Sequence, residues 1–485
     1  MENRREMLAR SPLLPLLIKL SVPAMLGMFV MASYNVVDAI FIGWGVGPLG
    51  IAATSVAFPM QLFVGALSMW IAMGTASLSS RKLGAGLDEV AERALANGFL
   101  MSSVLGFTTM TLGLIFVDDL IGLMGTAEPV ASYAKEYLRI VFLGNPLIIV
   151  GMLFNNTIRS EGNTRYAMYS MVLPAILNVF LDPLFIFGFK MGMAGAAWAT
   201  VTGQLVTLLW VLRYYLTGKR SLIELKFSKM PLRWEIDREI LSVGASEFAR
   251  QGALTVANSI LMNQISRYGS PQHIAAFSIM MKVSSLAVMP IFGLGQGMQP
   301  IVGYNTGAGR PDRTVSTVKT ALNFALYAGL VIWAVAMVKP EWFIDFFLNA
   351  DEVGFAEKQA LGKLAIRGVM LSFPLIPINV LASGYFQAEG RPILALMMTL
   401  LRQLVFLLPL IVFSTWFIEK YFGKGLNGFW FSFPIADALA CVVSVVFLAL
   451  DFKNKRRQIA EMESRRAAEP AAAVEASENL EGAAQ

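Results

Sequence analysis

The chain has one cysteine and one histidine among 485 residues, and only 15% of its residues are charged. A single cysteine, Cys441, excludes an intramolecular disulfide and a cysteine-based metal cluster. The single histidine, His273, lies in a short polar connection beside Pro271. The sequence also lacks a Walker-type loop, so we do not expect the chain to use ATP itself.

Apolar residues dominate what is present. They make up 56% of the sequence, and the mean hydropathy is +0.60. Soluble globular proteins are nearer half apolar and a quarter charged, so this composition indicates a membrane protein. The apolar runs are about 20 residues long, as a membrane-spanning helix requires, and they lack the short alternating pattern of a β-barrel. The net charge of +6 lies mostly between these runs, so it does not indicate nucleic-acid binding.

We predict twelve membrane-spanning helices. They cover roughly residues 13–41, 51–78, 96–117, 133–157, 166–189, 194–216, 240–266, 274–301, 318–338, 361–387, 393–417 and 428–450. Most Lys and Arg residues lie in the connections on the side of the N-terminus, which places both termini in the cytoplasm of a multi-pass plasma-membrane protein. The first apolar run is too long for a cleaved signal peptide.

A polar connection divides the chain into two halves. We expect an N-lobe over 1–217, a cytoplasmic linker over 218–239 and a C-lobe over 240–452. Residues 453–485 are rich in Ala and Glu without an apolar face, which indicates a disordered tail. The predicted fold is an all-α membrane protein with two lobes of six helices, and we expect it to function as a monomer.

The two halves repeat the same motifs in the same order. The segment "GTASLSSRKLGAG" (74–86) matches "GMQPIVGYNTGAG" (297–309), "NPLIIV" (145–150) matches "FPLIPI" (373–378), and "LDPLFIF" (181–187) matches "LLPLIVF" (407–413). Chance similarity between Gly-rich turns would not preserve this order. Matching segments cross in the same direction, so this is a parallel repeat, an arrangement that encloses a cavity between two lobes.

Two carboxylates, Asp38 and Asp182, lie inside apolar spans of the first half. Charges in hydrocarbon are costly, so they usually face a cavity or a partner. A rise of about 1.5 Å per residue places both carboxylates in the outer half of the bilayer, at the depth of Thr200 on the next span. Asn178 shares a helix face with Asp182, as Tyr34 does with Asp38, because each pair is four residues apart.

Pro183 changes the backbone beside Asp182. It has no N–H, so it leaves the carbonyl of Val179 free for a cation or water, and it disfavours helical geometry at Asp182. Two carboxylates in such a site favour the binding of a proton or a sodium ion. Alternatively, each Asp caps or hydrogen-bonds a neighbouring helix. The repeat argues against this alternative, because Leu408 stands opposite Asp182 in the second half.

The second half carries charges of its own. Glu247 and Arg250 are three residues apart, and Lys282 and Arg402 lie within later spans. One interpretation is a structural ion pair with two cations that reach the interface or contact carbonyls. The other is that Glu247 attracts a cationic substrate or joins a second ion site. The 27 methionines suit an adaptable cavity as well as ordinary core packing, and we expect Met31 to line that cavity.

At these residues the chain resembles the multidrug and toxic compound extrusion (MATE) family, in its DinF-like and MepA-like branch. The resemblance covers about residues 10–450 and is carried by "SVPAMLGMFVMASYNVVDAIFIG", "NVFLDPLFIFGFKMGMAGAAWAT" and "QPIVGYNTGAG". It implies a drug/proton or drug/sodium antiporter of two lobes that needs no cofactor. It also implies that Tyr34 lies beside the ion site and that the first helix bends at Pro23. The implied site for the coupling H⁺ or Na⁺ consists of Asp38, Asn178, Asp182 and Thr200.

The match to the family is incomplete in the C-lobe. Glu247 lies where the branch more often has "SPF", and this chain has "SEF". No carboxylate of the tenth span matches the essential acids of the NorM-like branch.

Three functions compete. The leading hypothesis is export of amphipathic, often cationic, drug-like compounds in exchange for H⁺ or Na⁺, with bending at Pro23 and Pro183. The alternative is a flippase for a lipid-linked precursor, whose cationic cavity only Arg250, Lys282 and Arg402 would supply. An intramembrane aspartyl protease would need a "GxGD" turn, which neither Asp has, so the chain is not expected to be an enzyme.

Overall fold

The computed structural model describes residues 2–217, 221–226, 232–345, 355–422 and 425–482, and all regular secondary structure in those ranges is helical. The short α1 (Glu2–Arg10) precedes the two lobes. The N-lobe contains α2 (Leu13–Gly45), α3 (Pro48–Gly84), α4 (Asp88–Ile115), α5 (Val117–Leu123), α6 (Val130–Leu143), α7 (Asn145–Ser160), α8 (Thr164–Pro183), η1 (Leu184–Gly188) and α9 (Gly192–Leu216). The C-lobe contains α10 (Trp234–Tyr268), α11 (Pro271–Gly307), α12 (Pro311–Val338), α13 (Pro340–Asp345), α14 (Phe355–Met370), η3 (Phe373–Leu375), α15 (Ile376–Ala388), α16 (Pro392–Leu400), η4 (Leu401–Leu407), α17 (Leu408–Phe422) and α18 (Gly425–Gly482).

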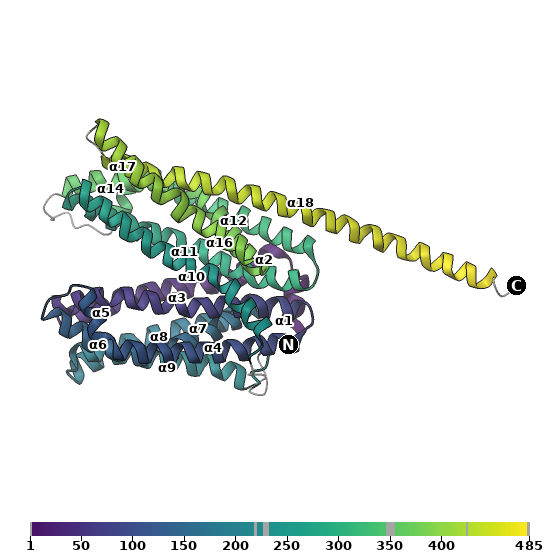
Figure 1. Ribbon diagram of the computed structural model, residues 1–485, viewed down its shortest axis with the longest axis horizontal. Coiled ribbons are helices and arrows are strands. Elements are labelled where there is room, and N and C mark those ends of the chain that lie inside the picture. Colours follow the sequence, from purple (N-terminus) through teal and green to yellow (C-terminus); the bar gives the residue numbers. More distant parts are fainter. Residues whose placement is uncertain (1, 218–220, 227–231, 346–354, 423–424, 483–485) are drawn as a thin grey trace.

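The helices confirm an all-α membrane protein with two lobes. Within the described ranges, ten helices are long and apolar enough to cross a membrane, and α6 with α7 adds an eleventh across a 51° bend. With 35 residues, α10 is as long as these spans, and it completes six in each lobe although it is more polar. Figure 1 shows the two groups of helices side by side, with α3 to α9 in one and α10 to α18 in the other.

Two predicted boundaries differ from the helices observed. α10 begins at Trp234 rather than at residue 240, because Glu235 and Asp237 in its first turn suit the positive end of a helix. The tail predicted to be disordered continues α18 as far as Gly482, since its many Ala and Glu residues favour a helix (Figure 1). Residues 218–220 and 227–231 of the predicted linker lie outside the described residues.

The sequence repeat corresponds to a structural one. α7 begins at Asn145 and Pro146, where the span bends by 51°, and the matching Phe373 and Pro374 form the 3₁₀ turn η3 inside the tenth span. In both places the proline stands in the first turn of a helical segment, where its missing N–H removes no hydrogen bond. The same motif therefore breaks the same span in each lobe.

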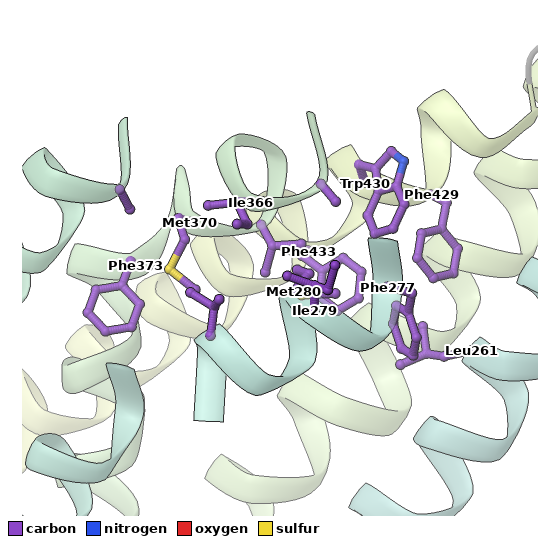
Figure 2. Close-up of a cluster of buried hydrophobic side chains, with 14 of the residues drawn as sticks. Leu261, Phe277, Ile279, Met280, Ile366, Met370, Phe373, Phe429, Trp430 and Phe433 are labelled. Atoms are coloured by element: carbon purple, nitrogen blue, oxygen red, sulfur yellow. The ribbon is translucent and has the colours of Figure 1, made fainter. Parts of the chain in front are cut away.

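Each lobe has its own apolar core. In the C-lobe, side chains from α10, α11, α14 and α18 meet around Trp430, which is 1% exposed. Figure 2 shows Phe277 of α11 beside Phe429 of α18, and their ring centroids are 6.0 Å apart in an edge-on arrangement. Such aromatic pairs add stability beyond the area they bury. This cluster joins four helices of the C-lobe into one packed unit.

The described helices of the two lobes make close contact at one end, which we call the terminal face because α1 and the extension of α18 lie there (Figure 1). Toward the other end the two groups of helices diverge (Figure 1). Glycines of α3, α10 and α11 allow this contact. If any of them carried a β-carbon, that atom would lie 2.2 Å or less from an atom of a facing helix, either in the other group or in α2. These glycines are Gly74, Gly84, Gly244, Gly297 and Gly307. The repeated glycines of 74–86 and 297–309 thus let the backbones touch, and the structure is closed at the terminal face.

The short helix α1 connects the two lobes across the terminal face. Arg5 forms an ion pair of 2.7 Å with Asp88 at the start of α4. The carbonyl oxygen of Leu8 accepts hydrogen bonds from Asn305 at 3.1 Å and from Arg313 at 3.2 Å, both in the C-lobe. The side chain of Leu8 is fully buried. These contacts hold the terminal face closed in addition to the glycine contacts.

Candidate functional site

The predicted ion-site residues come from α2, α8 and α9, which pack against one another in the N-lobe. The hydroxyls of Tyr34 and Thr200 lie 3.2 Å apart, so these two residues from α2 and α9 meet at one depth. Asp182 is fully buried and Asn178, one turn away on α8, is 3% exposed. The amide of Asn178 lies against Gly203 of α9, where a β-carbon would be 3.3 Å from it. Asp38 and Asp182 lie close enough for their charges to interact.

Several buried oxygens at this site have no hydrogen-bond partner. They are Oδ1 of Asp38, Oδ1 of Asn178 and both carboxylate oxygens of Asp182. Buried polar atoms in proteins are almost always satisfied, and an unpaired buried carboxylate is especially costly. The site is rich in acceptors and poor in donors. A proton on a carboxylate, or a cation that takes oxygen ligands, would satisfy it.

The structure adds two residues that sequence reasoning missed. Gln61 of α3 donates from Nε2 to the hydroxyl of Tyr137 on α6, at 3.1 Å. Tyr137 is 4% exposed and lies within range of the charges of Asp38 and Asp182. Both are polar side chains in apolar spans, so extending the search from charged to neutral polar residues would have found them.

The backbone around Asp182 differs from the prediction. Asp182 is helical, because α8 continues through Pro183, and the irregularity follows in the π-helical turn η1. Such turns often occur at functional sites. α2 likewise continues as one helix through Pro23, which is buried. Met31, expected in the cavity, is 40% exposed on α2.

The C-lobe charges are partnered. Arg250 donates from Nε to Oε2 of Glu247 at 2.9 Å and lies over the ring of Phe292. Arg402 on η4 donates to Oδ1 of Asp437 at 2.6 Å. Asp437, in the last span, was overlooked in the sequence although it is an acid inside an apolar run. These ion pairs agree with a structural role for the C-lobe charges. Among the described C-lobe residues, no pair of unpartnered carboxylates like Asp38 and Asp182 is seen.

A second buried acid, Glu161, lies outside the spans in the turn between α7 and α8. Its carboxylate accepts hydrogen bonds from the Leu222 amide at 2.7 Å, from the Tyr214 hydroxyl at 2.9 Å and from the Ser221 hydroxyl. It therefore anchors linker residues to the N-lobe. Glu389 follows the motif "FPLIPI" at the same spacing at which Glu161 follows "NPLIIV", and it pairs with Lys455 of α18 at 2.5 Å.

Burial raises the pKa of Glu161 to about 7, against the opposing effects of its hydrogen bonds and of Arg4. The folded protein then binds a proton more tightly than the unfolded chain, so stability falls as pH rises from about 4.3 toward 7 and is constant above that. We expect thermal unfolding in detergent at pH 4.5 and pH 7.5 to show a smaller pH-dependent loss for Glu161→Gln than for the wild type.

The exposed Glu136→Gln serves as the control, and it should keep the wild-type pH dependence. Equal pH dependence in Glu161→Gln and Glu136→Gln would contradict a stabilising protonation at Glu161.

Known proteins similar to this chain share its two repeated halves. The family model described as MatE matches residues 23–184 and 251–413, one segment in each lobe. A FAD transporter from Shewanella oneidensis is 25% identical over 454 residues, which cover 90% of this chain and 95% of that protein. The multidrug export protein MepA from Staphylococcus saprophyticus is 26% identical over 435 residues, covering 89% and 92%. A solved MOP-superfamily transporter from Pyrococcus furiosus superposes with a TM-score of 0.86 at 26% identity, covering 93% and 98%.

Proposed function

The chain belongs to the MatE family, as a MATE transporter of the MepA-like kind, and on this premise we propose that it exports amphipathic, often cationic, compounds in exchange for protons or sodium ions. Its multidrug export relatives support drug-like substrates. Like other members of the family it is a transporter and not an enzyme. Its many apolar spans make it a multi-pass membrane protein.

The observation that carries ion coupling is the set of unpartnered oxygens around Asp182. Both of its carboxylate oxygens are buried without a hydrogen-bond donor, in reach of the charge of Asp38. Within the described residues, no group of three or more His, Cys, Asp or Glu side chains is arranged to hold a metal ion. A sodium ion would therefore rest on two carboxylates and on neutral oxygens of Asn178 and Thr200. A proton needs only one of the carboxylates.

Ion binding would drive export only if it favours one conformation over the other. The site joins α2, α8 and α9, and α2 also packs against α11 of the C-lobe. A change in the packing of α2, with Pro23 and Pro183 as bending points, would therefore transmit ion binding to the interface between the lobes. The binding of the ion from the open end would favour release of the exported compound there.

We also propose that the terminal face is cytoplasmic. Arg4 and Arg5 belong to α1, which lies at that face, and Arg81 and Lys82 lie in the last turn of α3, whose glycines make the contacts there. Positive charges favour the cytoplasmic side. The closed terminal face would then make this the conformation open toward the outside. Function as a monomer in the plasma membrane, without nucleic-acid partners, stays a prediction.

The flippase alternative gains no support. The sequence offered Arg250, Lys282 and Arg402 as the cations of its cavity, but Arg250 and Arg402 are each held by a carboxylate of the same lobe, Glu247 and Asp437. The pairs carry no net charge for a lipid pyrophosphate. We therefore do not propose this function.

Reconstitution into liposomes tests the proposal. A pH gradient or a sodium gradient, imposed separately, is expected to drive accumulation of an amphipathic cationic dye, followed by its fluorescence. Only one of the two gradients should act if one ion is coupled. Protein-free liposomes are the control, and dye movement that ignores both gradients would refute ion-coupled export.

A further inference from the structure

A polar cavity lies between the lobes, nearer the terminal face than the ion site. It is about 20 Å³ in volume, room for one water molecule. Polar side chains of α3 and α7 line it from the N-lobe, and those of α11 and α15 from the C-lobe. They include Ser77, Asn156, Arg159, Gln296, Gln299 and Gln387.

Among the described residues that line this cavity, Arg159 is the only charged one. It is 7% exposed, and its guanidinium donates to Oε1 of Gln296 at 2.5 Å and to Oδ1 of Asn155 at 2.8 Å. Both acceptors are neutral amides. No described carboxylate forms an ion pair with it, in contrast to Arg250 and Arg402. A buried cation without an anion beside it is costly. An anionic ligand could provide the counter-ion that Arg159 lacks.

The bond between Arg159 and Gln296 joins the two lobes. Arg159 belongs to α7 and Gln296 to α11. This hydrogen bond therefore exists only while the terminal face is closed. Parting of the lobes would remove Gln296 and leave donors of the guanidinium free. Around it the carboxamides of Gln299 and Gln387 bond to each other at 3.0 Å and provide further polar surface.

We propose that Arg159 binds an anionic group, a carboxylate or a phosphate, of a transported compound when the terminal face opens. The planar guanidinium matches such oxyanions, and the ion pair would supply the missing counter-ion. Closure returns Gln296 to Arg159 and displaces the anionic group toward the other end. This inference rests on the proposed export function and adds amphipathic anions to its substrates.

Binding of matched probes to the purified full-length protein tests the inference. One pair is a coumarin carboxylate and its uncharged primary amide, and the other is a coumarin phosphate monoester and the parent hydroxycoumarin. Each anionic probe is expected to bind about tenfold more tightly than its uncharged partner, as a charge-assisted hydrogen bond provides. The two pairs show separately whether the site takes carboxylates or phosphates.

Variants assign the preference to Arg159. Arg159→Gln should abolish the difference within each pair, and Arg159→Lys should keep part of it. Gln296→Glu places a carboxylate beside Arg159, so it should lower the affinity for the anionic probe about tenfold and leave the uncharged probe unchanged. Arg165→Gln removes an exposed arginine of α8 and should behave like the wild type.

Equal affinity for both members of each pair in the wild type would overturn the inference, and so would a preference that survives in folded Gln296→Glu protein. If Arg159→Gln does not fold, the wild type and Gln296→Glu still decide. Gradient-driven transport of the cationic dye depends only on the proposed function. Its failure would therefore be distinguishable from a missing charge preference.

Discussion

Asp182→Asn is expected to reduce gradient-driven export to below about a tenth of the wild-type rate, because the coupling ion loses the carboxylate that distinguishes the two conformations. Asn fills the same space and keeps the helix α8, so the protein should still fold. Asp182 is fully buried, and both of its oxygens lack donors, so no other described group already compensates its charge. The measurement is dye transport in liposomes under a pH gradient and under a sodium gradient.

Two further variants make this prediction specific. Asp38→Asn should cause a loss of the same order, since the two carboxylates share one site. Asp119→Asn changes an exposed acid of the short helix α5, outside the ion site, and should leave transport unchanged. If folded Asp182→Asn and Asp38→Asn proteins both transported at the wild-type rate, the ion site would have to lie elsewhere.

Gly74→Ala is expected to open the terminal face and to slow transport. A β-carbon at Gly74 would lie 1.9 Å from the carbonyl oxygen of Ile240 on α10, which is backbone and cannot turn aside. Overpacking of this kind costs about 1–3 kcal/mol, enough to lower the ratio of closed to open protein about tenfold. Cysteine labelling would detect the change, with Ala76→Cys as the reporter in a Cys441→Ser background. Ala76 is 7% exposed at the closed interface, so its labelling should become about tenfold faster.

Gly65→Ala is the matched control on the same helix. A β-carbon there meets nothing within 4 Å, so the variant should label and transport like the wild type. Identical behaviour of Gly74→Ala and Gly65→Ala would show that the glycine contacts do not hold the terminal face closed.

Much of the fold was readable from the sequence because a membrane imposes simple requirements. Apolar runs must be long enough to cross the bilayer, so the spans and the two lobes followed from length and hydropathy. Acids inside such runs stand out, and helical periodicity placed Asn178 and Asp182 on one face at the depth of Thr200. In the structure the hydroxyls of Tyr34 and Thr200 lie 3.2 Å apart, so α2 and α9 meet at that depth.

The partners of individual side chains were decided by the tertiary structure. Asp437 neutralises Arg402 across 35 positions, Gln61 bonds to Tyr137 across 76, and Arg159 meets Gln296 across 137. Nothing in the local sequence selects such partners, because they depend on which helix faces meet after the lobes pack. The composition and periodicity of the chain thus determined an all-helical membrane protein of two lobes, and they placed Asp38 and Asp182 at one depth in the first lobe. Only the packing of distant helices decided which charges are paired, where the lobes close, and that one buried arginine has no acid beside it.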